Sequence, residues 1–412
     1  MNQSFRFFLG ISICLIGVPL GMYLSYFFPG VKWSHLNMLL SILLISNWKN
    51  IFALRFPIRS RIIAFVGVFQ VLMLLYGIFS ADKFIFDKYC IFQFFVLGLC
   101  VAYSSNSCSI SFNKLPNYIF GLSFGVNICG AYLCSLGLVS GEEAFLMKLY
   151  DDNYVIDPIT VSLGAAINVI SGIFLDKNKT LLRVLFYIAI CLAIYTFITT
   201  FKRTLILFCI FAVFIYLYKN AKLNMNVVIK SFKILLIAIL LFFILSLFDD
   251  EIGEKISEVC LHFYNGVLTL FGKKTTYDVN SSAVARVVQR DMAFLDFELN
   301  AKPINYILGM GYIKYYIDAP IIESYLDMGI LGLVGYFTIA VLFPLRCFLS
   351  MKTKKGYFLL PLVLGFETML EMFSAGNPYG YTQYVYIVLL GVTLEIFKKN
   401  NRQNYGKENR MD

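Results

Sequence analysis

Charged residues are scarce in this chain of 412 residues: only 15% are Asp, Glu, Lys or Arg, whereas 59% are hydrophobic. Soluble globular proteins carry about 25% charged residues, which they need to cover their surface. The composition therefore excludes a soluble multidomain enzyme, and its hydrophobicity excludes a disordered chain. It is typical of a polytopic membrane protein.

Motifs for metal and redox chemistry are also missing. The chain has only two histidines, His35 and His262, which are far apart and not part of an HExxH motif. Its 10 cysteines form no CxxC pair, which argues against a disulfide scaffold or a zinc ribbon. There is no P-loop and no complete GxGxxG, and Gly309 with Gly311 is interpreted as a turn. We expect no metal and no cofactor.

Long apolar segments fill most of the chain, and at about 20 residues per membrane span they provide roughly a dozen helices. The first of them is too long for a signal-peptide core and lacks a small-x-small cleavage site, so we expect it to remain as a span. The predicted spans are 5–28, 34–47, 62–80, 84–103, 117–140, 158–175, 183–201, 204–218, 232–248, 326–349, 357–374 and 380–397.

The predicted fold class is therefore an all-α polytopic integral membrane protein with about 12 transmembrane helices. Residues 1–397 form a single transmembrane domain, and residues 398–412 (KKNNRQNYGKENRMD) are expected to be a disordered cytoplasmic tail. One large polar loop, at about 249–325, separates the ninth and tenth spans. The acidic connection 141–157 is interpreted as a solvated face, with a lid as the alternative.

The distribution of charge predicts the orientation, because Lys and Arg are retained on the cytoplasmic side of a membrane. If both termini are cytoplasmic, most of the 35 Lys and Arg residues fall on that side, together with few of the 25 Asp and Glu residues. The large loop is then periplasmic. The net charge of +10 reflects membrane orientation on this interpretation, so nucleic-acid binding is not expected.

Lys202 and Arg203 interrupt an apolar stretch, 184–218, that is too long for one span at about 1.5 Å per residue. The chain must turn there, on the outer side, where two adjacent cations oppose the orientation rule. Either they extend into the interface between lipid and water, or Arg203 binds the phosphates of a lipid-linked substrate. A guanidinium group suits the second role because it matches two phosphate oxygens at once.

The large loop contains a predicted helix, SSAVARVVQRDMAFLDFEL (281–299), with apolar residues at mostly helical spacing. Arg286 and Arg290 lie one turn apart on one face of it. They are either part of a solvated stripe or, together with Arg203, an anion cradle that neutralises a diphosphate leaving group.

Four carboxylates are candidates for a general base. Asp318 precedes Ala319 and Pro320, the arrangement of a helix N-cap, but at the mouth of a span it and Glu323 can also accept a proton. Glu367 and Glu371 share a helix face in the outer half of the predicted eleventh span. Ionisable groups at membrane depth are functional hypotheses by default.

Glycines recur at every third position in the tenth predicted span, at Gly329, Gly332 and Gly335. Small residues at such spacing let a neighbouring helix approach closely. We therefore interpret these three glycines as a packing surface.

The order of these features resembles the bacterial superfamily of O-antigen polymerases and O-antigen ligases. The likeness rests on KRTLIL (202–207), RVVQRD (286–291), LGMGY (308–312) and a polar segment that opens the next span, D followed by ESYLDMGILG (318–332). The resemblance implies a GT-C-like glycosyltransferase in the bacterial inner membrane. It also implies transfer of a glycan from undecaprenyl diphosphate to a sugar hydroxyl at the periplasmic face.

By the same resemblance, Arg203, Arg286 and Arg290, with Lys202 beside them, would bind the diphosphate while a carboxylate deprotonates the acceptor. The implied partners are an undecaprenyl-diphosphate-linked oligosaccharide, membrane lipids and a chain-length regulator. Ligases of the superfamily carry a histidine where this chain has Asp318, which favours a polymerase of repeat units.

Two alternatives stay open. One is the ligase that transfers finished polymer to the lipid A-core. The other is a flippase for lipid-linked oligosaccharides or another secondary transporter, since these are also basic proteins with many spans.

Overall fold

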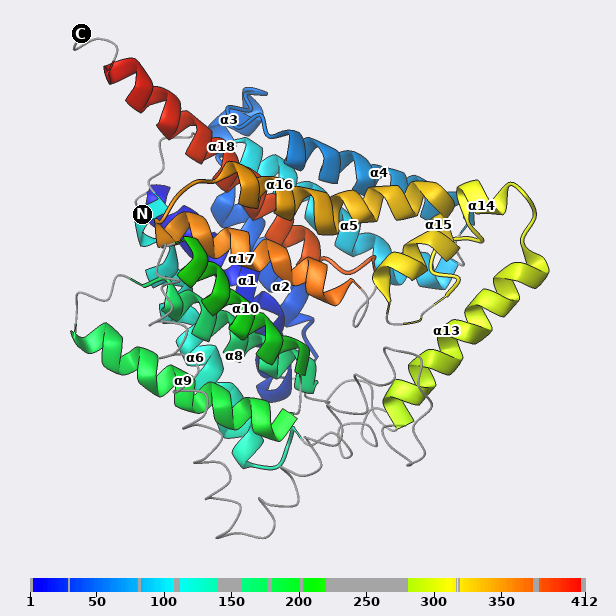
Figure 1. Cartoon of the computed structure of the whole chain (residues 1–412), viewed down its shortest axis with the longest axis horizontal. Helices are drawn as coiled ribbons and strands as arrows, with labels where there is room; N and C mark the ends of the chain where they lie inside the picture. Colours follow the sequence, from blue (N-terminus) through cyan, green and yellow to red (C-terminus); the bar gives the residue numbers. More distant parts are fainter. Residues whose placement is uncertain are drawn as a thin grey trace.

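The computed structural model describes residues 3–28, 30–80, 83–106, 112–139, 157–175, 180–200, 203–219, 281–315, 317, 319–372 and 378–408. Within these ranges the structure is helical and has no strand (Figure 1). The helices are α1 (Gln3–Phe27), α2 (Trp33–Ile45), α3 (Trp48–Phe52), α4 (Arg61–Ser80), α5 (Lys83–Ser104), η1 (Phe112–Lys114), α6 (Leu115–Ser135), α8 (Pro158–Ile173), α9 (Thr180–Thr200), α10 (Arg203–Lys219), α13 (Ser281–Asn300), α14 (Asn305–Leu308), α15 (Pro320–Phe337), η2 (Thr338–Leu342), α16 (Phe343–Ser350), α17 (Gly356–Glu371) and α18 (Thr382–Glu408).

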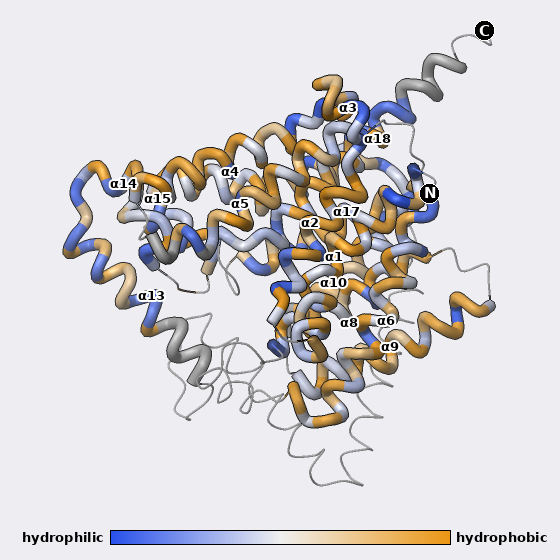
Figure 2. Tube along the Cα trace, turned by 180° about the vertical axis from the view of Figure 1, so that it is seen from behind, coloured by the Kyte–Doolittle hydropathy of each residue, from blue (hydrophilic) through white to orange (hydrophobic). Residues whose placement is uncertain are grey.

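The lengths and composition of the helices identify a helical membrane protein. Five helices in the described part are long and apolar enough to cross a membrane: Gln3–Phe27, Arg61–Ser80, Phe112–Ser135, Thr180–Thr200 and Pro320–Ser350. Shorter apolar helices cover Trp33–Ile45, Tyr89–Ser104, Pro158–Ile173 and Leu205–Lys219. The helices of the bundle are hydrophobic along most of their length (Figure 2).

Glycines allow α1 and α2 to lie close together and antiparallel. A Cβ atom at Gly10 would lie 2.8 Å from Ile45 Cγ1, and one at Gly21 would lie 2.5 Å from Ser34 Oγ. Lipid tails are as apolar as the side chains, so membrane helices associate through close packing at small residues and through hydrogen bonds. The second kind of contact joins α6 to α8, where Asn127 Nδ2 donates to Asn168 Oδ1 (3.1 Å).

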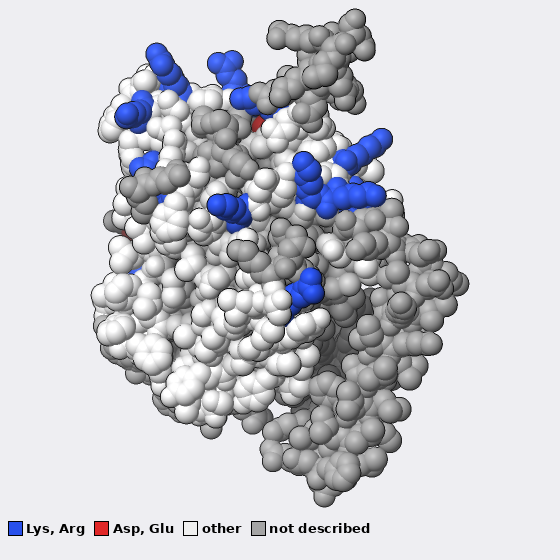
Figure 3. All heavy atoms as spheres, turned by 90° about the vertical axis from the view of Figure 1, so that its left-hand side faces the viewer, with Lys and Arg blue, Asp and Glu red and all other residues white. Residues whose placement is uncertain are grey.

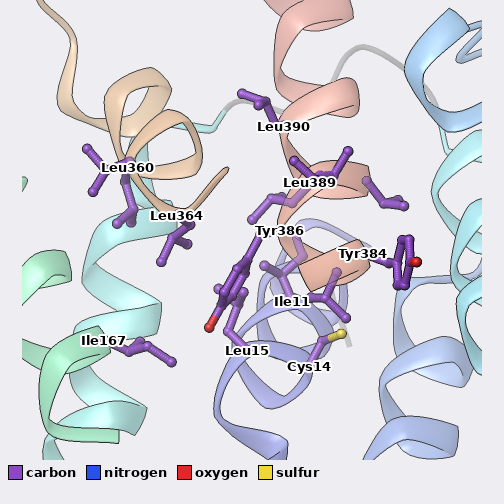
Figure 4. Close-up of a cluster of buried hydrophobic side chains, with 14 of the residues drawn as sticks. Ile11, Cys14, Leu15, Ile167, Leu360, Leu364, Tyr384, Tyr386, Leu389 and Leu390 are labelled. Atoms are coloured by element: carbon purple, nitrogen blue, oxygen red, sulfur yellow. The ribbon is translucent and has the colours of Figure 1, made fainter. Parts of the chain in front are cut away.

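Helix α18 passes through the middle of the bundle, and its residues from Gln383 to Leu394 are buried. Around it, side chains of α1 and α17 form a continuous apolar core (Figure 4). The residues in this close-up include Ile11, Cys14 and Leu15 of α1, Leu360 and Leu364 of α17, and Tyr386, Leu389 and Leu390 of α18.

One end of the bundle gathers basic side chains, and we call it the basic end. There Arg6 Nη2 donates to Ser46 O (2.8 Å), which joins the start of α1 to the end of α2. Lys219 Nζ donates to Phe348 O (2.7 Å), which joins the end of α10 to α16. Figure 3 looks onto the left-hand side of Figure 1 and shows many Lys and Arg side chains and few Asp or Glu side chains.

The opposite end, which we call the distal end, holds the segments that carry most candidate residues. Tyr312 N donates to Ser80 Oγ (3.1 Å) at the end of α4, and Ile321 N donates to Met372 O (3.2 Å) just after α17. The end of α4, the start of α15 and the end of α17 therefore meet here.

The number of membrane crossings remains a prediction. Lys219 ends α10 at the basic end, whereas Pro320 begins α15 at the distal end. The chain passes from one end to the other between these two residues. The predicted span 232–248 falls in this interval but lies outside the described residues.

Two predicted boundaries differ from the structure. Helix α15 begins at Pro320, before the predicted start of the tenth span at residue 326, whereas the start of the predicted loop 249–325 lies outside the described residues. Helix α18 continues to Glu408, so the predicted disordered tail from residue 398 is helical over that range.

Candidate functional site

Helix α15 is broken at Gly329, which has φ 62° and ψ −152°. This conformation is almost restricted to glycine because it has no Cβ. A Cβ atom at Gly332 would lie 2.1 Å from Ser324 O, on the other side of the break, so the first half of α15 folds back against the second. The chain thus presents a half-helix, Pro320 to Met328, at the distal end.

The predicted glycine turn caps the end of this half-helix. Met310 N donates to Leu326 O (2.9 Å) and Gly311 N donates to Asp327 O (3.1 Å). These carbonyls lie at the end of the half-helix, where helical partners are missing. Only a glycine at position 309 allows the turn to lie this close to the half-helix, because a Cβ atom there would collide with Asp327 O at 2.1 Å; Gly309 also has a positive φ of 75°. The interpretation of Gly309 and Gly311 as a turn is confirmed.

The three glycines of α15 therefore have different roles. A Cβ atom at Gly335 would lie 2.2 Å from the ring of Phe69 on α4, so the predicted close approach of a neighbouring helix is confirmed there. Gly329 forms the break and also allows the close approach of α14, because a Cβ atom there would lie 2.3 Å from Ile307 O. Gly332 contacts Ser324 in the other half of its own helix, so at this position alone the prediction of a surface for a neighbouring helix is wrong.

Asp327 is fully buried and was not among the predicted site residues. Its Oδ1 accepts a hydrogen bond from Tyr315 N (3.0 Å), and its Oδ2 accepts one from the Tyr379 hydroxyl (2.9 Å). The carboxyl group thereby joins the half-helix to the segment before it and to the connection between α17 and α18. Because both oxygens are occupied, we assign Asp327 a structural role.

Glu323 lies one turn before Asp327 and is also fully buried. Its Oε2 accepts a hydrogen bond from Ile317 N (3.4 Å). Tyr89 of α5 lies near enough for the charge of Glu323 to act on its hydroxyl group. Glu323 is thus inside the first turn of α15 and faces the bundle, rather than lying at an exposed mouth.

Asp318 lies outside the described residues, so its predicted roles stay predictions. The N-cap position of α15 falls on Ala319, whose side chain makes no capping hydrogen bond. The helix begins with Pro320, which has no N–H group that would need a capping partner.

Glu367 and Glu371 lie one turn apart on α17, near its distal end, as predicted. Glu367 is buried, with 1% of its surface exposed. No described N–H or O–H donor reaches either of its carboxyl oxygens, and the polar group beside it is the carboxyl of Glu371. Gln383 lies within reach of Glu371, and its Oε1 accepts a hydrogen bond from the Tyr336 hydroxyl (2.5 Å).

The hydroxyl of Tyr336 lies near several of the predicted carboxylates. It lies within electrostatic reach of Glu371, Glu367 and Glu323. The structure thus gathers three of the four predicted carboxylates between α15 and α17. Asp327 could have been found from its position four residues after Glu323 in an otherwise apolar segment.

The predicted arginine helix is present as α13. Its Ala293 and Phe297 are buried against Leu326 and neighbouring residues, so this face of α13 points to the half-helix. Positions 286 and 290 fall on the same face by helical spacing.

The side chain of Arg290 is 44% exposed, and its Nε lies 3.9 Å from Asp291 Oδ1. Arg203 begins α10, whose other end is at the basic end, so its backbone lies toward the distal end. The side chains of Arg203 and Arg286, and all of Lys202, lie outside the described residues. The anion cradle therefore stays a prediction.

Tyr315 links α13 to the half-helix. Its hydroxyl donates to Asp296 Oδ2 of α13 (2.6 Å), and its N–H donates to Asp327 Oδ1 of the half-helix (3.0 Å). It lies in the connection before α15. Burial raises the pKa of Tyr315 above its ordinary value of about 10, and the hydrogen bond to Asp296 raises it further.

The described residues contain no group of three or more His, Cys, Asp or Glu side chains that could hold a metal ion. A scan of protein-family models and a search of curated protein sequences find no match to this chain. Function is therefore argued from the chemistry of the distal end.

Proposed function

We propose that this chain is a membrane glycosyltransferase that joins oligosaccharide repeat units carried on a lipid diphosphate, as an O-antigen polymerase does. The observation that carries the proposal is that the arginine-bearing segments and the gathered carboxylates belong to the same end of the bundle. Helix α13, which carries Arg286 and Arg290, packs on the half-helix that carries Glu323. Arg203 begins α10 toward this end as well.

The basic end supports the proposed orientation. Under the positive-inside rule this end faces the cytoplasm, together with both termini, in a bacterial inner membrane. The distal end then faces the periplasm, where lipid-linked repeat units would be joined. Membrane lipids surround the bundle, and a chain-length regulator would be a partner at the same face.

The reaction requires two kinds of group. The acceptor hydroxyl attacks the anomeric carbon of the donor, a new glycosidic bond forms, and the bond from that carbon to the lipid diphosphate breaks. The leaving diphosphate takes the bonding electrons, and arginines stabilise its charge. A carboxylate takes the hydroxyl proton, and Glu323, Glu367, Glu371 and Asp318 are the candidates.

Among the candidates, the surroundings differ. Glu371 lies at the end of α17, is only partly buried, and sits where α15 and α17 meet, so an acceptor could reach it. Glu323 and Glu367 are enclosed by protein. Glu371 is therefore the preferred base.

A flippase or another secondary transporter is the second candidate. Transporters commonly have broken helices that carry the substrate site, and α15 is broken at Gly329. Buried carboxylates within spans are also typical of proton-coupled transport. The transporter hypothesis predicts movement of lipid-linked oligosaccharide without any new glycosidic bond.

A deletion strain separates these functions. Loss of a polymerase leaves core carrying a single repeat unit. Loss of a ligase leaves bare core, with polymer retained on the lipid carrier. Loss of a flippase leaves single repeat units on the carrier and none on the core. We expect the first pattern, and either of the others would contradict the proposal.

Arginine substitutions test the site. We expect Arg203→Ala, Arg286→Ala and Arg290→Ala each to abolish long chains at unchanged protein abundance. Lysine should rescue poorly, because it cannot present a planar fork to two phosphate oxygens. Arg346→Ala, at the exposed basic end, is the matched control and should leave the chain-length ladder intact. Normal ladders in all three distal variants would reject these assignments.

A further inference from the structure

The carboxyl group of Glu367 sits inside the bundle, and that of Glu371, one turn further along α17, is partly buried at its distal end. Helix α17 carries both, α18 contributes Gln383 and Tyr386, and α15 contributes Tyr336. On the α10 side, Phe211 packs edge to face on Phe366, at 5.2 Å between ring centroids, so that helix presents an apolar ring at this level.

No described cation balances this pair. Ion pairs in the described residues join Arg290 to Asp291 and Lys398 to Glu395, and neither involves α17. The titratable groups that face the pair are Tyr336 and Glu323 from α15 and Tyr386 from α18. All of these are neutral or acidic, so the described residues around the pair add no positive charge.

Two ionised carboxylates in these surroundings would be strongly unfavourable. Glu367 would lose its hydration and Glu371 part of it, and the two charges would repel each other through a medium of low dielectric constant. One proton removes half of the charge and turns the repulsion into a hydrogen bond between a carboxyl and a carboxylate. This arrangement is known for pairs of neighbouring acids that share one proton.

The hydrogen bonds around Glu371 indicate which member holds the proton. The Tyr336 hydroxyl donates to Gln383 Oε1, so the remaining amide group of Gln383 is a donor. That amide lies within reach of Glu371 and favours its charged form. No described donor reaches Glu367, which is the more deeply buried of the two, so the proton belongs on Glu367 and Glu371 is the ionised member.

A further polar group points into this site. The hydroxyl of Tyr386 is fully buried and has no hydrogen-bond partner in the described part of the chain. Figure 4 shows it directed away from its own helix α18, and it lies within electrostatic reach of Glu367 and Glu371. A buried hydroxyl without a partner is costly, so a free hydroxyl within electrostatic reach of two carboxyl groups leaves a donor for a group that enters this site.

We propose that Glu367 and Glu371 form a proton-binding site that holds one proton between them, with Gln383 keeping Glu371 ionised and Tyr386 available as an alternative donor. A metal ion is a poorer ligand here, because no group of three acidic, histidine or cysteine side chains converges among the described residues. The site stands on its own contacts and does not depend on the proposed transferase activity. If that activity is established, Glu371 is the general base and Glu367 is the residue that holds the proton.

Infrared spectroscopy of the purified full-length protein tests the site. At neutral pH we expect a C=O stretch from a protonated carboxylic acid that is lost in Glu367→Gln. In Glu371→Gln the band should persist but shift, because the acceptor of its hydrogen bond has changed. Glu395→Gln, at the basic end, is the matched control and should leave the spectrum unchanged. A Glu367→Gln spectrum equal to that of the wild type would overturn the proposal.

A second measurement needs no substitution. A hydrophobic carbodiimide reacts with protonated carboxyl groups in apolar surroundings, and mass spectrometry locates the product. We expect modification of Glu367 that diminishes as pH rises and is the same in sodium and potassium buffers. Absence of modification at Glu367 would overturn the proposal, as would protection by sodium alone, which would indicate a cation site instead. Neither result bears on whether the protein forms glycosidic bonds.

Discussion

The hydrogen bond between Asp327 and Tyr379 offers the sharpest test of how the distal end is built. Asp327→Ala removes the acceptor of two buried donors, the Tyr315 N–H and the Tyr379 hydroxyl. Tyr379→Phe removes one donor and keeps the ring, which packs against Tyr312 at 4.6 Å between centroids. The double variant removes both partners.

The expected magnitudes follow from these contacts. A buried donor left without an acceptor costs about 1–3 kcal/mol, so Asp327→Ala should lower the free energy of unfolding by about 2–6 kcal/mol. Tyr379→Phe should cost about 1 kcal/mol. The two effects should not add, because the double variant no longer buries an unpaired hydroxyl. We expect a coupling energy of about 1–3 kcal/mol between the two positions.

The assay is denaturant unfolding in detergent micelles, followed by circular dichroism, for the wild type and the three variants. Tyr381→Phe is the matched control, since the Tyr381 hydroxyl is buried without a hydrogen-bond partner in the described part of the chain. Its removal should be neutral or stabilising. Additivity of Asp327→Ala and Tyr379→Phe within about 0.5 kcal/mol would refute the proposed link between the half-helix and the α17–α18 connection.

Two further predictions concern packing and pH. Gly335→Ala should lower the unfolding free energy by about 1–3 kcal/mol, because its Cβ would lie 2.2 Å from the Phe69 ring, whereas Gly125→Ala on α6 meets open space and should be neutral or stabilising. Equal effects in thermal unfolding would contradict this. Because the pKa of Tyr315 is raised in the folded state, its contribution to the free energy of unfolding is complete below pH about 10, the ordinary pKa of tyrosine. The contribution falls as pH rises above that value, because the unfolded state loses the proton first. The loss of stability above that pH should therefore be smaller in Tyr315→Phe, which lacks the hydrogen bond to Asp296. Identical pH profiles of unfolding for the wild type and this variant would contradict the prediction.

Hydropathy predicted the helices well, because a run of apolar residues long enough for a membrane has few other uses. The break within α15 could not be predicted in this way. Gly329 breaks the helix inside an apolar run, and only its positive φ and the contact of Gly332 with Ser324 O reveal that the chain folds back.

The site was predicted in part. Glu367 and Glu371 stood out because carboxylates are rare within spans. Asp327 did not, because its role depends on Tyr379, which is distant in sequence, and on the backbone N–H of Tyr315. Local sequence patterns carry no information about how the glycine turn folds against the half-helix.

The most direct test of the central claim uses purified protein in liposomes that contain lipid-linked repeat units as both donor and acceptor. The account predicts a ladder of lengthened, lipid-linked oligosaccharides, with one lipid diphosphate released for every unit added. Redistribution of unaltered single units across the bilayer, with no lengthened product, would contradict it and assign the chain to transport.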